Sequence, residues 1–336
     1  MKVTAPGKWR SLAMLGLTLM SFSACKKDAH VEPVTTTETS QAILADHPTF
    51  KGANLAITFT NSAPISLSNK SNITISGIAT TSITLNNCSN ITITNCKIGP
   101  NAGVGIQIYQ CANVKVSSCY IFNVTSGVYA ILSQGINVAY NQAKNMLGPY
   151  PRGQFVQFNN VTGTGNRVNY NKFQNVLGQS YPEDAINLYQ SSGTYADPIQ
   201  VNGNQIRGGG PSTTGGGIVL GDKGGSYVTA QWNILVDPGQ YGMAIAGGTN
   251  MIMNSNTIYS KQLSFSNVGL LYWNQSGKSS SAITMKGNNI NFTASGGYIN
   301  NSYVPYGGLV PSGWGSNYYN KSLGEATLPT TLVTIP

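Results

Sequence analysis

The sequence carries little charge and almost no histidine. Charged residues make up 9% of the 336 residues, and the two histidines, His30 and His47, both lie near the N-terminus. Histidine-based catalytic triads and histidine-ligated metal sites are therefore excluded from the rest of the chain. Any catalytic base there must be a lysine, an arginine, a tyrosine or a carboxylate.

Arginine is scarce as well. The chain has four arginines and no basic run after residue 27, although its formal net charge is +9. Nucleic-acid binding needs many phosphate contacts, so we expect no nucleic-acid partner. Asparagine, serine, threonine, glutamine and tyrosine predominate between the apolar positions. Such a surface suits polyhydroxyl ligands, with a mild attraction for anions.

The apolar run near the N-terminus is too short to span a membrane. It extends from Leu12 to Leu19, against the roughly 20 residues that a transmembrane helix needs. Basic residues precede it and Phe-Ser-Ala-Cys follows at 22–25, the pattern of a signal peptide. Small residues before a cysteine resemble a bacterial lipobox. The resemblance implies a lipoprotein signal peptide over residues 1–24 and a lipid on Cys25; an ordinary signal peptide is the alternative.

Residues 25–49 contain few large apolar side chains and cannot bury enough surface to fold alone. Lys26-Lys27-Asp28 resembles the charged start of lipoproteins that are sent to the outer surface of Gram-negative cells. We therefore expect a flexible tether here. The protein would be lipid-anchored in the outer membrane, facing the exterior, and would touch the membrane only through the lipid.

A five-residue motif recurs along the rest of the chain. Asn-Tyr-Asn-Lys-Phe at 169–173 returns as Asn-Gly-Asn-Gln-Ile at 202–206 and Asn-Ser-Asn-Thr-Ile at 254–258. The central asparagines are 23 to 33 residues apart and stand at 141, 171, 204, 233, 256 and 288. Irregular spacing around a fixed motif indicates stacked coils with loops of variable length.

Apolar residues alternate with polar ones in the same region, as in Ile73-Thr-Ile75 and Ile91-Thr-Ile93. This period of two predicts strands with one buried face. Repeat and alternation together resemble the right-handed parallel β-helix superfamily, the pectate-lyase-like fold, over about residues 50–325. We predict an all-β domain over 50–336, a single-stranded parallel β-helix solenoid of about nine coils. The tail from Gly307 to Pro336 is expected to cap the last coil.

Four cysteines repeat at the spacing of the early coils. Cys88 and Cys111 are 23 residues apart, and so are Cys96 and Cys119. Cys96 and Cys119 align with the motif asparagine, which predicts an internal ladder of small side chains from coil to coil. A metal site is disfavoured, since no CxxC spacing and no nearby histidine occur. Disulfides between adjacent coils remain open.

Loops lengthen between Asn141 and Asn256. One set of insertions precedes the first strand of successive coils, at 144–154, 174–184, 207–216 and 236–242, and a second set follows that strand at 190–198 and 222–227. The two sets predict opposite walls of a groove. Its floor would be the outward strand face around Gln157, Asn187 and Val219. In the superfamily that the chain resembles, enzymes bind polysaccharide in such a groove.

Acids are rare in the predicted domain, and three of them border this groove. Glu183 and Asp184 end one wall loop, and aligning Ile186 with Ile218 puts Asp222 beside Gln190. The three acids suit either a Ca²⁺ site or an acid–base pair. No cofactor other than Ca²⁺ is expected. The alternative is turn chemistry. Asp197 and Asp237 precede prolines and are interpreted as turn residues.

Positive and aromatic side chains complete the predicted site. Lys223, Arg152 and Arg207 would supply positive charge, and in lyases of the superfamily a lysine or arginine removes the C5 proton of a uronic acid. The remaining substrate-binding candidates are polar floor residues and groove-side aromatics, which stack on sugar rings: Gln157, Asn187, Tyr189, Tyr241 and Trp273. No diagnostic lyase motif is present, and the polygalacturonase motifs are absent as well.

These features predict a monomeric cell-surface lipoprotein that acts on an extracellular, acidic polysaccharide. The chemistry would be that of a lyase or a glycosidase. The alternative is a surface β-helix protein that binds glycans or adheres without catalysis. A fold of this kind hosts many functions, so the site has to decide between them.

Overall fold

The computed structural model describes residues 58–275, 280–305 and 308–336. The chain divides into two units, Met1–Thr49 and Phe50–Pro336. The predicted signal peptide, the tether and Cys25 lie outside the described residues. In the described part of the second unit the only helices are two 3-10 turns, η1 (Trp314–Ser316) and η2 (Glu325–Thr327). No helix among the described residues is long and apolar enough to cross a membrane.

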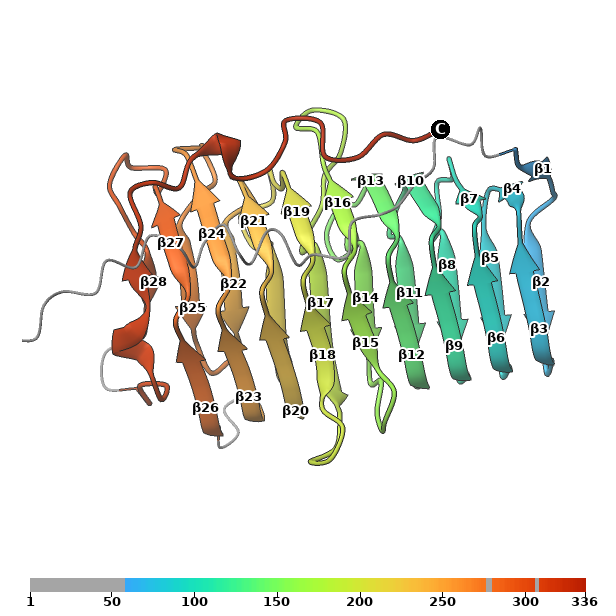
Figure 1. Cartoon of the computed structure of the whole chain (residues 1–336), viewed down its shortest axis with the longest axis horizontal. Coiled ribbons are helices and arrows are strands. Elements are labelled where there is room, and N and C mark those ends of the chain that lie inside the picture. Colours follow the sequence, from blue (N-terminus) through green and yellow to red (C-terminus); the bar gives the residue numbers. More distant parts are fainter. Residues whose placement is uncertain (1–57, 276–279, 306–307) are drawn as a thin grey trace, which may run out of the picture. The chain divides into compact units, whose positions relative to one another are not determined.

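Three stacks of parallel strands build the domain (Figure 1). Stack 1 holds the first strand of each coil: β2 (Ile65–Ser68), β5 (Ile83–Asn86), β8 (Ile106–Tyr109), β11 (Val128–Ile131), β14 (Val156–Asn159), β17 (Ile186–Ser192), the first half of β20 (Ile218–Gln231), β22 (Tyr241–Ile245), β25 (Val268–Tyr272) and β28 (Ser302–Tyr303). Stack 2 holds the second strands: β3 (Ser71–Ser76), β6 (Ser89–Thr94), β9 (Ala112–Ser117), β12 (Gln134–Ala139), β15 (Arg167–Asn169), β18 (Ile199–Asn202), the second half of β20, β23 (Thr249–Asn254) and β26 (Ser281–Lys286).

Stack 3 is a separate 11-stranded sheet: β1 (Thr60–Asn61), β4 (Ile78–Thr80), β7 (Lys97–Ile98), β10 (Tyr120–Val124), β13 (Gln142–Met146), β16 (Lys172–Gln174), β19 (Gln205–Arg207), β21 (Ile234–Val236), β24 (Thr257–Ser260), β27 (Asn289–Phe292) and β29 (Tyr318–Tyr319). Among the described residues, nine complete coils run from β2–β3–β4 to β25–β26–β27. The prediction of an all-β parallel solenoid of about nine coils is confirmed.

The alternation in the sequence explains the packing. Ile91 and Ile93 of β6 are buried and pair in register with Ile73 and Ile75 of β3, while the threonine between them faces outward. Each inward side chain therefore lies on the equivalent side chain of the next coil. These rows form one continuous apolar core along the domain.

The motif asparagines form the predicted ladder. Asn141 Nδ2 donates to Asn171 Oδ1 at 3.0 Å, and Asn171 Nδ2 donates to Asn204 Oδ1 at 3.0 Å. The same bond continues through 233, 256 and 288 to Asn317, which the sequence analysis missed. At each of these buried rungs the side-chain oxygen also accepts a backbone N–H of the preceding coil. The ladder thus satisfies polar groups that would otherwise be costly to bury.

The cysteines extend this arrangement into the early coils as free, buried thiols. The Cys119 N–H donates to Asn141 Oδ1 at 3.0 Å, so Cys119 occupies the ladder position. A hydrogen bond with Cys119 lowers the pKa of Cys96 to about 7. Among the described residues, no group of three or more His, Cys, Asp or Glu side chains could hold a metal ion. The cysteines therefore form ladders from coil to coil.

The C-terminal tail differs in part from the expected cap. Trp314 packs against the end of the core and β29 pairs with β27, but residues 320–336 then run back along stack 3 (Figure 1). Gln174 bonds the backbone at Thr330, Leu332 and Val333, which fixes the tail on this face. The physical reason is that β21 turns Ile234 and Val236 outward, and these side chains require cover.

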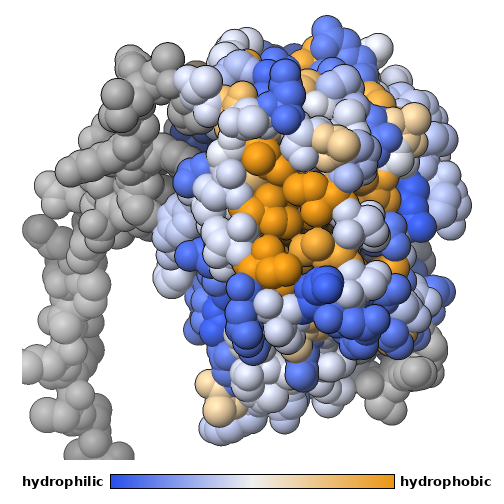
Figure 2. Space-filling view, turned by 90° about the vertical axis from the view of Figure 1, so that its right-hand side faces the viewer, coloured by the Kyte–Doolittle hydropathy of each residue, from blue (hydrophilic) through white to orange (hydrophobic). Residues whose placement is uncertain are grey.

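The opposite end of the domain leaves apolar side chains at the surface. Figure 2 looks onto the first coil and shows them gathered at the centre of this end. Ile65, Leu67, Ile73 and Ile78 are only partly buried against the core. Inward residues of a first coil have a neighbouring coil on one side only, which explains this exposure.

Candidate functional site

A groove of about 680 Å³ crosses the outward face of stack 1. Its floor contains Gln157 of β14, Asn187 of β17 and Val219 of β20, as the sequence predicted, and continues to Ala244 and Leu271. Parallel pairing in register brings these residues from successive coils into one row, because each strand repeats the orientation of its neighbour.

One wall of the groove comes from the long loops before stack 1. These loops contribute Tyr150–Arg152, Glu183–Asp184, Thr213–Thr214 and Gln240–Tyr241. The opposite side differs from the prediction, because residues 222–227 form no loop but belong to β20, one continuous strand of 14 residues. An irregularity in its pairing with β17 shifts the register, so Asp222 lies opposite Tyr189 and not Gln190.

Two carboxylates meet on the groove floor through one amide. Asn187 Nδ2 donates to Asp184 Oδ2 at 2.8 Å and to Asp222 Oδ2 at 3.1 Å. Gln157 Nε2 donates to Asn187 Oδ1 at 2.9 Å, which turns the Asn187 amide nitrogen toward both acids. Because both oxygens bond one nitrogen, they lie no more than about 6 Å apart, close to the separation of about 5–5.5 Å between the two carboxyl groups of retaining glycosidases.

The two acids differ in how deeply they are buried. Asp184 is 5% exposed, and its oxygens accept bonds from the Tyr241 hydroxyl, the Gly216 N–H and Asn187 Nδ2. Desolvation nevertheless dominates and raises the pKa of Asp184 to about 7. Asp222, in contrast, is only half-buried. Asp184 therefore carries a proton on a large share of molecules near neutral pH.

Tyr241 is the partner that orients Asp184. Burial and the charge of Asp184 raise the pKa of Tyr241 well above its usual value, so its hydroxyl remains a donor. The hydroxyl donates to Asp184 Oδ1. The sequence analysis placed Tyr241 on the groove as a sugar-stacking side chain; it lines the groove, but its ring is buried and its hydroxyl is bonded to Asp184.

Glu183 points away from this pair. Its Oε2 accepts the Ser212 hydroxyl at 2.6 Å, and its Oε1 accepts the Thr214 hydroxyl at 2.6 Å. The same turn leads to Gly216, whose N–H binds Asp184. Glu183 thus fixes the wall loop that helps to hold Asp184. Neither serine nor threonine in that loop carried a signal in the sequence, since hydroxyls are common on this surface.

The three acids do not fit the Ca²⁺ site that the sequence suggested. Ca²⁺ takes six to eight oxygen ligands at about 2.3–2.6 Å. Both oxygens of Glu183 are bonded to hydroxyls of its own wall, while Asp184 and Asp222 are held by Asn187. Within the described ranges no cluster of three acidic or sulfur ligands could hold a metal.

Two of the three predicted cations lie in the groove. Arg152 and Lys223 line opposite sides of it, and the Arg152 guanidinium lies 4.5 Å from the centre of the Tyr129 ring. In the part of the chain that the structure describes, neither forms an ion pair. Tyr129, missed by the sequence analysis, lies on a neighbouring coil and holds the arginine by a cation–π contact.

Arg207 is not in the groove. Strand β19 turns Ile206 into the core and Arg207 outward on stack 3, where its guanidinium donates to the tail carbonyls of Glu325 and Leu328 at 3.0 and 3.2 Å. The prediction placed Arg207 at the beginning of a wall loop. Strand β19 extends through this residue, so the alternation of the strand decides its direction.

Several aromatic residues line the groove. Tyr189 and Trp273 line it, as predicted, and Trp273 exposes much of its indole. Tyr150 also lines it. Two surface aromatics, Tyr150 and Trp273, therefore lie at its margins, where a sugar ring could stack.

Asp197 and Asp237 bond backbone N–H groups of nearby turns. Desolvation by itself would raise the pKa of Asp197, but the bond from the Gly165 N–H at 2.7 Å and the pairing with Arg167 together lower it. Asp237 accepts the Lys261 N–H at 3.0 Å. Neither residue lines the groove.

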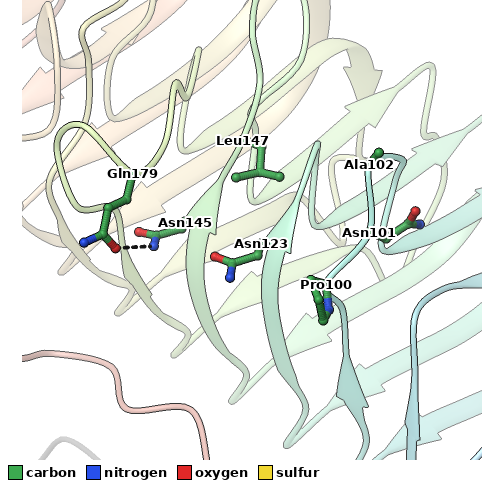
Figure 3. A pocket seen from close by; sticks show the side chains of 7 residues that line it. All are labelled: Pro100, Asn101, Ala102, Asn123, Asn145, Leu147 and Gln179. Carbon is green, nitrogen blue, oxygen red and sulfur yellow. Dashed lines mark hydrogen bonds between the residues drawn. The ribbon is translucent and has the colours of Figure 1, made fainter.

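A second depression, of about 550 Å³, lies on the other side of the same loops (Figure 3). It is lined by Asn123, Asn145, Leu147 and Gln179 together with residues 100–102, and Asn145 Nδ2 donates to Gln179 Oε1 at 3.2 Å. Figure 3 shows its side-chain amides around an open surface. It contains no titratable group, so the groove with its acids is the candidate site.

Three parallel stacks that repeat coil by coil define a single-chain β-solenoid. The family model described as "Right handed beta helix region" matches residues 56–232, more than half of the chain, and the chain therefore belongs to this family. The match includes the groove acids and both groove cations. No curated protein matches the chain.

Proposed function

We propose that this protein cleaves an acidic polysaccharide in the stack 1 groove by glycosidase chemistry. The observation that supports it best is the pair Asp184 and Asp222, joined through Asn187 but placed in different environments. Two carboxyl groups whose environments differ can divide the roles of acid and base. Their separation is in the range that glycoside hydrolysis uses.

Asp184 is the proposed general acid. Its Oδ1 already accepts bonds from Tyr241 and Gly216, so the proton of the neutral form belongs on Oδ2, on the side of Asn187 and Asp222. From there it passes to the glycosidic oxygen as the bond to the sugar breaks. A pKa of about 7 gives the acid its proton near neutral pH and matches proton donation at that pH.

Asp222 is the proposed base or nucleophile. It is the more exposed member of the pair, and Asn187 orients its Oδ2. Either it removes a proton from the attacking water or it attacks the sugar carbon itself. A separation of no more than about 6 Å fits the nucleophile of a retaining enzyme better, since inverting enzymes hold their two carboxyl groups about 6.5–9.5 Å apart.

Arg152 and Lys223 support an acidic substrate. Both line the groove on either side of the acid pair, and neither is used in an ion pair within the described residues. A carboxylate or sulfate on the polymer would partner them without displacing an existing bond. The nearby Tyr189 and Trp273 offer ring faces for the sugars.

A reducing-end assay on uronic-acid polymers tests this proposal. The domain, its Asp184→Asn and Asp222→Asn variants, and the turn variant Asp197→Asn would be compared. We expect new reducing ends that the first two substitutions abolish and the third preserves. Reducing ends accompanied by unsaturated products, seen by ultraviolet absorbance, would instead mean a lyase, with Lys223 or Arg152 as its base.

Glycan binding without catalysis is the second candidate. It is favoured by the complete bonding of Asp184, whose two oxygens already have three donors and which exposes 5% of its surface. Binding of a uronic-acid oligosaccharide that survives in Asp184→Asn, together with no turnover in the parent protein, would establish this function.

The cellular location is proposed from the sequence alone. Cys25 after small residues and a short apolar run supports a lipid-anchored protein of the outer membrane that faces outward. Fatty-acid labelling of cells tests it: Cys25→Ser should lose the label and leave the membrane fraction. Equal label in both forms would contradict the lipid anchor.

A further inference from the structure

The end of the solenoid at the first coil carries an open strand edge as well as apolar side chains (Figure 2). Among the described residues, β6 is the one strand that pairs with β3, so the backbone groups on the other edge of β3 have no strand beside them. Ile73 of β3 also leaves part of its side chain at this surface. An exposed edge of this kind is a template for another strand, and native proteins cover it.

The first coils repeat every 18 residues. The asparagine pairs Asn69–Asn87 and Asn72–Asn90 are both 18 residues apart, and β2 pairs with β5, and β3 with β6, in the same register. β1 pairs with β4 in this register too, with Thr60 opposite its equivalent in β4. The 18-residue repeat therefore continues to the first described strand.

The order of strands along the chain determines what precedes β1. In the first complete coil one residue, Gly77, separates β3 from β4. β1 pairs with β4 and so occupies the stack 3 position of the coil before. Because consecutive elements of a coil follow one another closely, the residues before β1 fall at the stack 2 position, beside β3. In the 18-residue register, residues 53–57 align with residues 71–75 of β3.

The aligned segments have the same pattern of side chains. Residues 53–57 read Ala-Asn-Leu-Ala-Ile, and the first five residues of both β3 and β6 read Ser-Asn-Ile-Thr-Ile. Leu55 and Ile57 match Ile73 and Ile75, whose side chains belong to the core. The segment thus offers apolar side chains at the spacing of the row that the first coil leaves uncovered.

A row of exposed amides outside the buried ladder also points to this segment. Asn113 Nδ2 donates to Asn90 Oδ1 at 3.1 Å, and Asn90 Nδ2 donates to Asn72 Oδ1 at 3.0 Å. Within the described residues, Asn72 Nδ2 has no acceptor. Asn54 precedes Asn72 by the same 18 residues that separate Asn72 from Asn90, so its Oδ1 is in the position to accept the next bond.

We propose that residues 53–57 bind the open edge of β3 as a further parallel strand. Leu55 and Ile57 then lie over the apolar row of β3. The Asn54 side-chain oxygen accepts the bond from Asn72. This strand covers the apolar end of the domain and pairs its backbone groups, and it removes an edge at which two domains could associate end to end. The proposal does not depend on the catalytic proposal.

Disulfide trapping tests the register. The proposal puts Ala56 beside Thr74, about 4.8 Å away between Cα atoms, and about 9.6 Å from Thr92 on the next coil. A disulfide needs a Cα separation of roughly 4.4–6.8 Å. In a Cys25→Ser background the native thiols that remain are buried. On mild oxidation, Ala56→Cys with Thr74→Cys should form an internal disulfide, and Ala56→Cys with Thr92→Cys should not.

Mass spectrometry and a non-reducing gel distinguish the outcomes of this experiment. Equal yields in the two pairs, or no internal disulfide in either, would overturn the proposal. A disulfide-linked dimer in place of the internal bond would assign the edge of β3 to a second copy of the chain, which also overturns it.

Hydrogen exchange, followed by NMR, tests the cover. Leu55→Asp puts a charge on the apolar row, and Ala56→Asp, on the outward side of the same strand, is the matched control. The N–H groups of β3 that point away from β6 should exchange at least about tenfold faster in Leu55→Asp and within about twofold of the parent in Ala56→Asp. The N–H groups of β16, far along the domain, report whether the rest stays folded. Equal exchange at β3 in the two variants would refute the added strand; if β16 loosens as well, the disulfide pairs decide.

Discussion

The early and the middle coils share one construction but differ in length. In the early coils equivalent asparagines, Asn72, Asn90 and Asn113, are 18 and 23 residues apart. In the middle coils the ladder residues Asn141, Asn171 and Asn204 are 30 and 33 residues apart. The strands and the ladder are the same in both regions, so the added residues lie in the loops.

The residues of the candidate site lie in the coils that have the added residues. Among the described residues, no acid occurs before Glu183, and the early coils turn serine, threonine and asparagine to the outside. The groove, its acid pair and its two cations all lie in coils with long loops. The difference shows that the ladder and core hold the fold, while the loops supply the site. Substitutions in the two should therefore have separable effects.

The largest expected effect is on turnover. Asp222→Asn removes a carboxylate that acts only in the groove, so activity should fall about 10²- to 10⁴-fold. The melting temperature should move little, because Asn187 is the one described side chain that bonds Asp222. Reducing-end assays and thermal unfolding on the same sample measure both. A large loss of stability with activity retained per folded molecule would mean that Asp222 only supports its strand.

The ladder should give the reverse result. Asn204→Ala removes the bonds that the Asn204 side chain forms with Asn171 Nδ2, the Asn171 N–H and the Val168 carbonyl, and the free energy of unfolding should fall by roughly 3 kcal/mol or more. Urea unfolding measures it, with activity per folded molecule unchanged. The control Asn87→Gly removes an exposed amide of the early coils that bonds Asn69, outside the ladder, and should change stability by less than about 1 kcal/mol. Equal effects would contradict the role of the buried ladder.

The acid pair should also set a pH dependence. Burial raises the pKa of Asp184 from 3.8 to about 7, so the fold favours its neutral form. Activity should fall as pH rises through about 7, when the acid loses its proton. Stability should follow the same sign, being fully retained below the unfolded pKa and declining toward pH 7 and above.

Asp184→Asn is the control for that dependence. It cannot ionise, so the difference between its melting temperature and that of the parent should move in favour of the variant from pH 5 to pH 8. A constant difference over this range would show that Asp184 does not titrate as described.

The smallest effect is expected for the wall that Glu183 holds. Glu183→Ala frees the Ser212 and Thr214 hydroxyls and loosens the turn that presents Gly216 to Asp184. Turnover should fall about tenfold, less than for either carboxylate of the pair, since positioning and not proton transfer is lost. Thr213→Ala, on the same loop, should have little effect. A loss as large as that of Asp222→Asn would assign Glu183 a direct role.

Much of the fold could be predicted because it is periodic. The alternation around Ile73 and Ile91 and the repeated motif asparagine are local patterns, and each coil repeats the register of the last. The position of the groove followed from where the loops lengthen. The direction of the Arg207 side chain could not be predicted, because it depends on how far β19 extends before its loop begins.

The acid pair could be predicted only in part. Scarcity of acids directed attention to Glu183, Asp184 and Asp222, but one extra residue in β20 decided that Asp222 faces Tyr189. The turn at Ser212 and Thr214 decided that Glu183 faces its own wall. Neither feature leaves a periodic trace in the sequence.

By itself, then, the sequence determined the parallel solenoid, its number of coils, the polar ladder and the loop-rich face. These depend on periodic burial and on identical neighbours one coil away. Only the tertiary structure decided which oxygens meet at Asn187, which cations stay in the groove and where the tail runs. These features depend on contacts between different coils and loops, whose geometry no local pattern encodes.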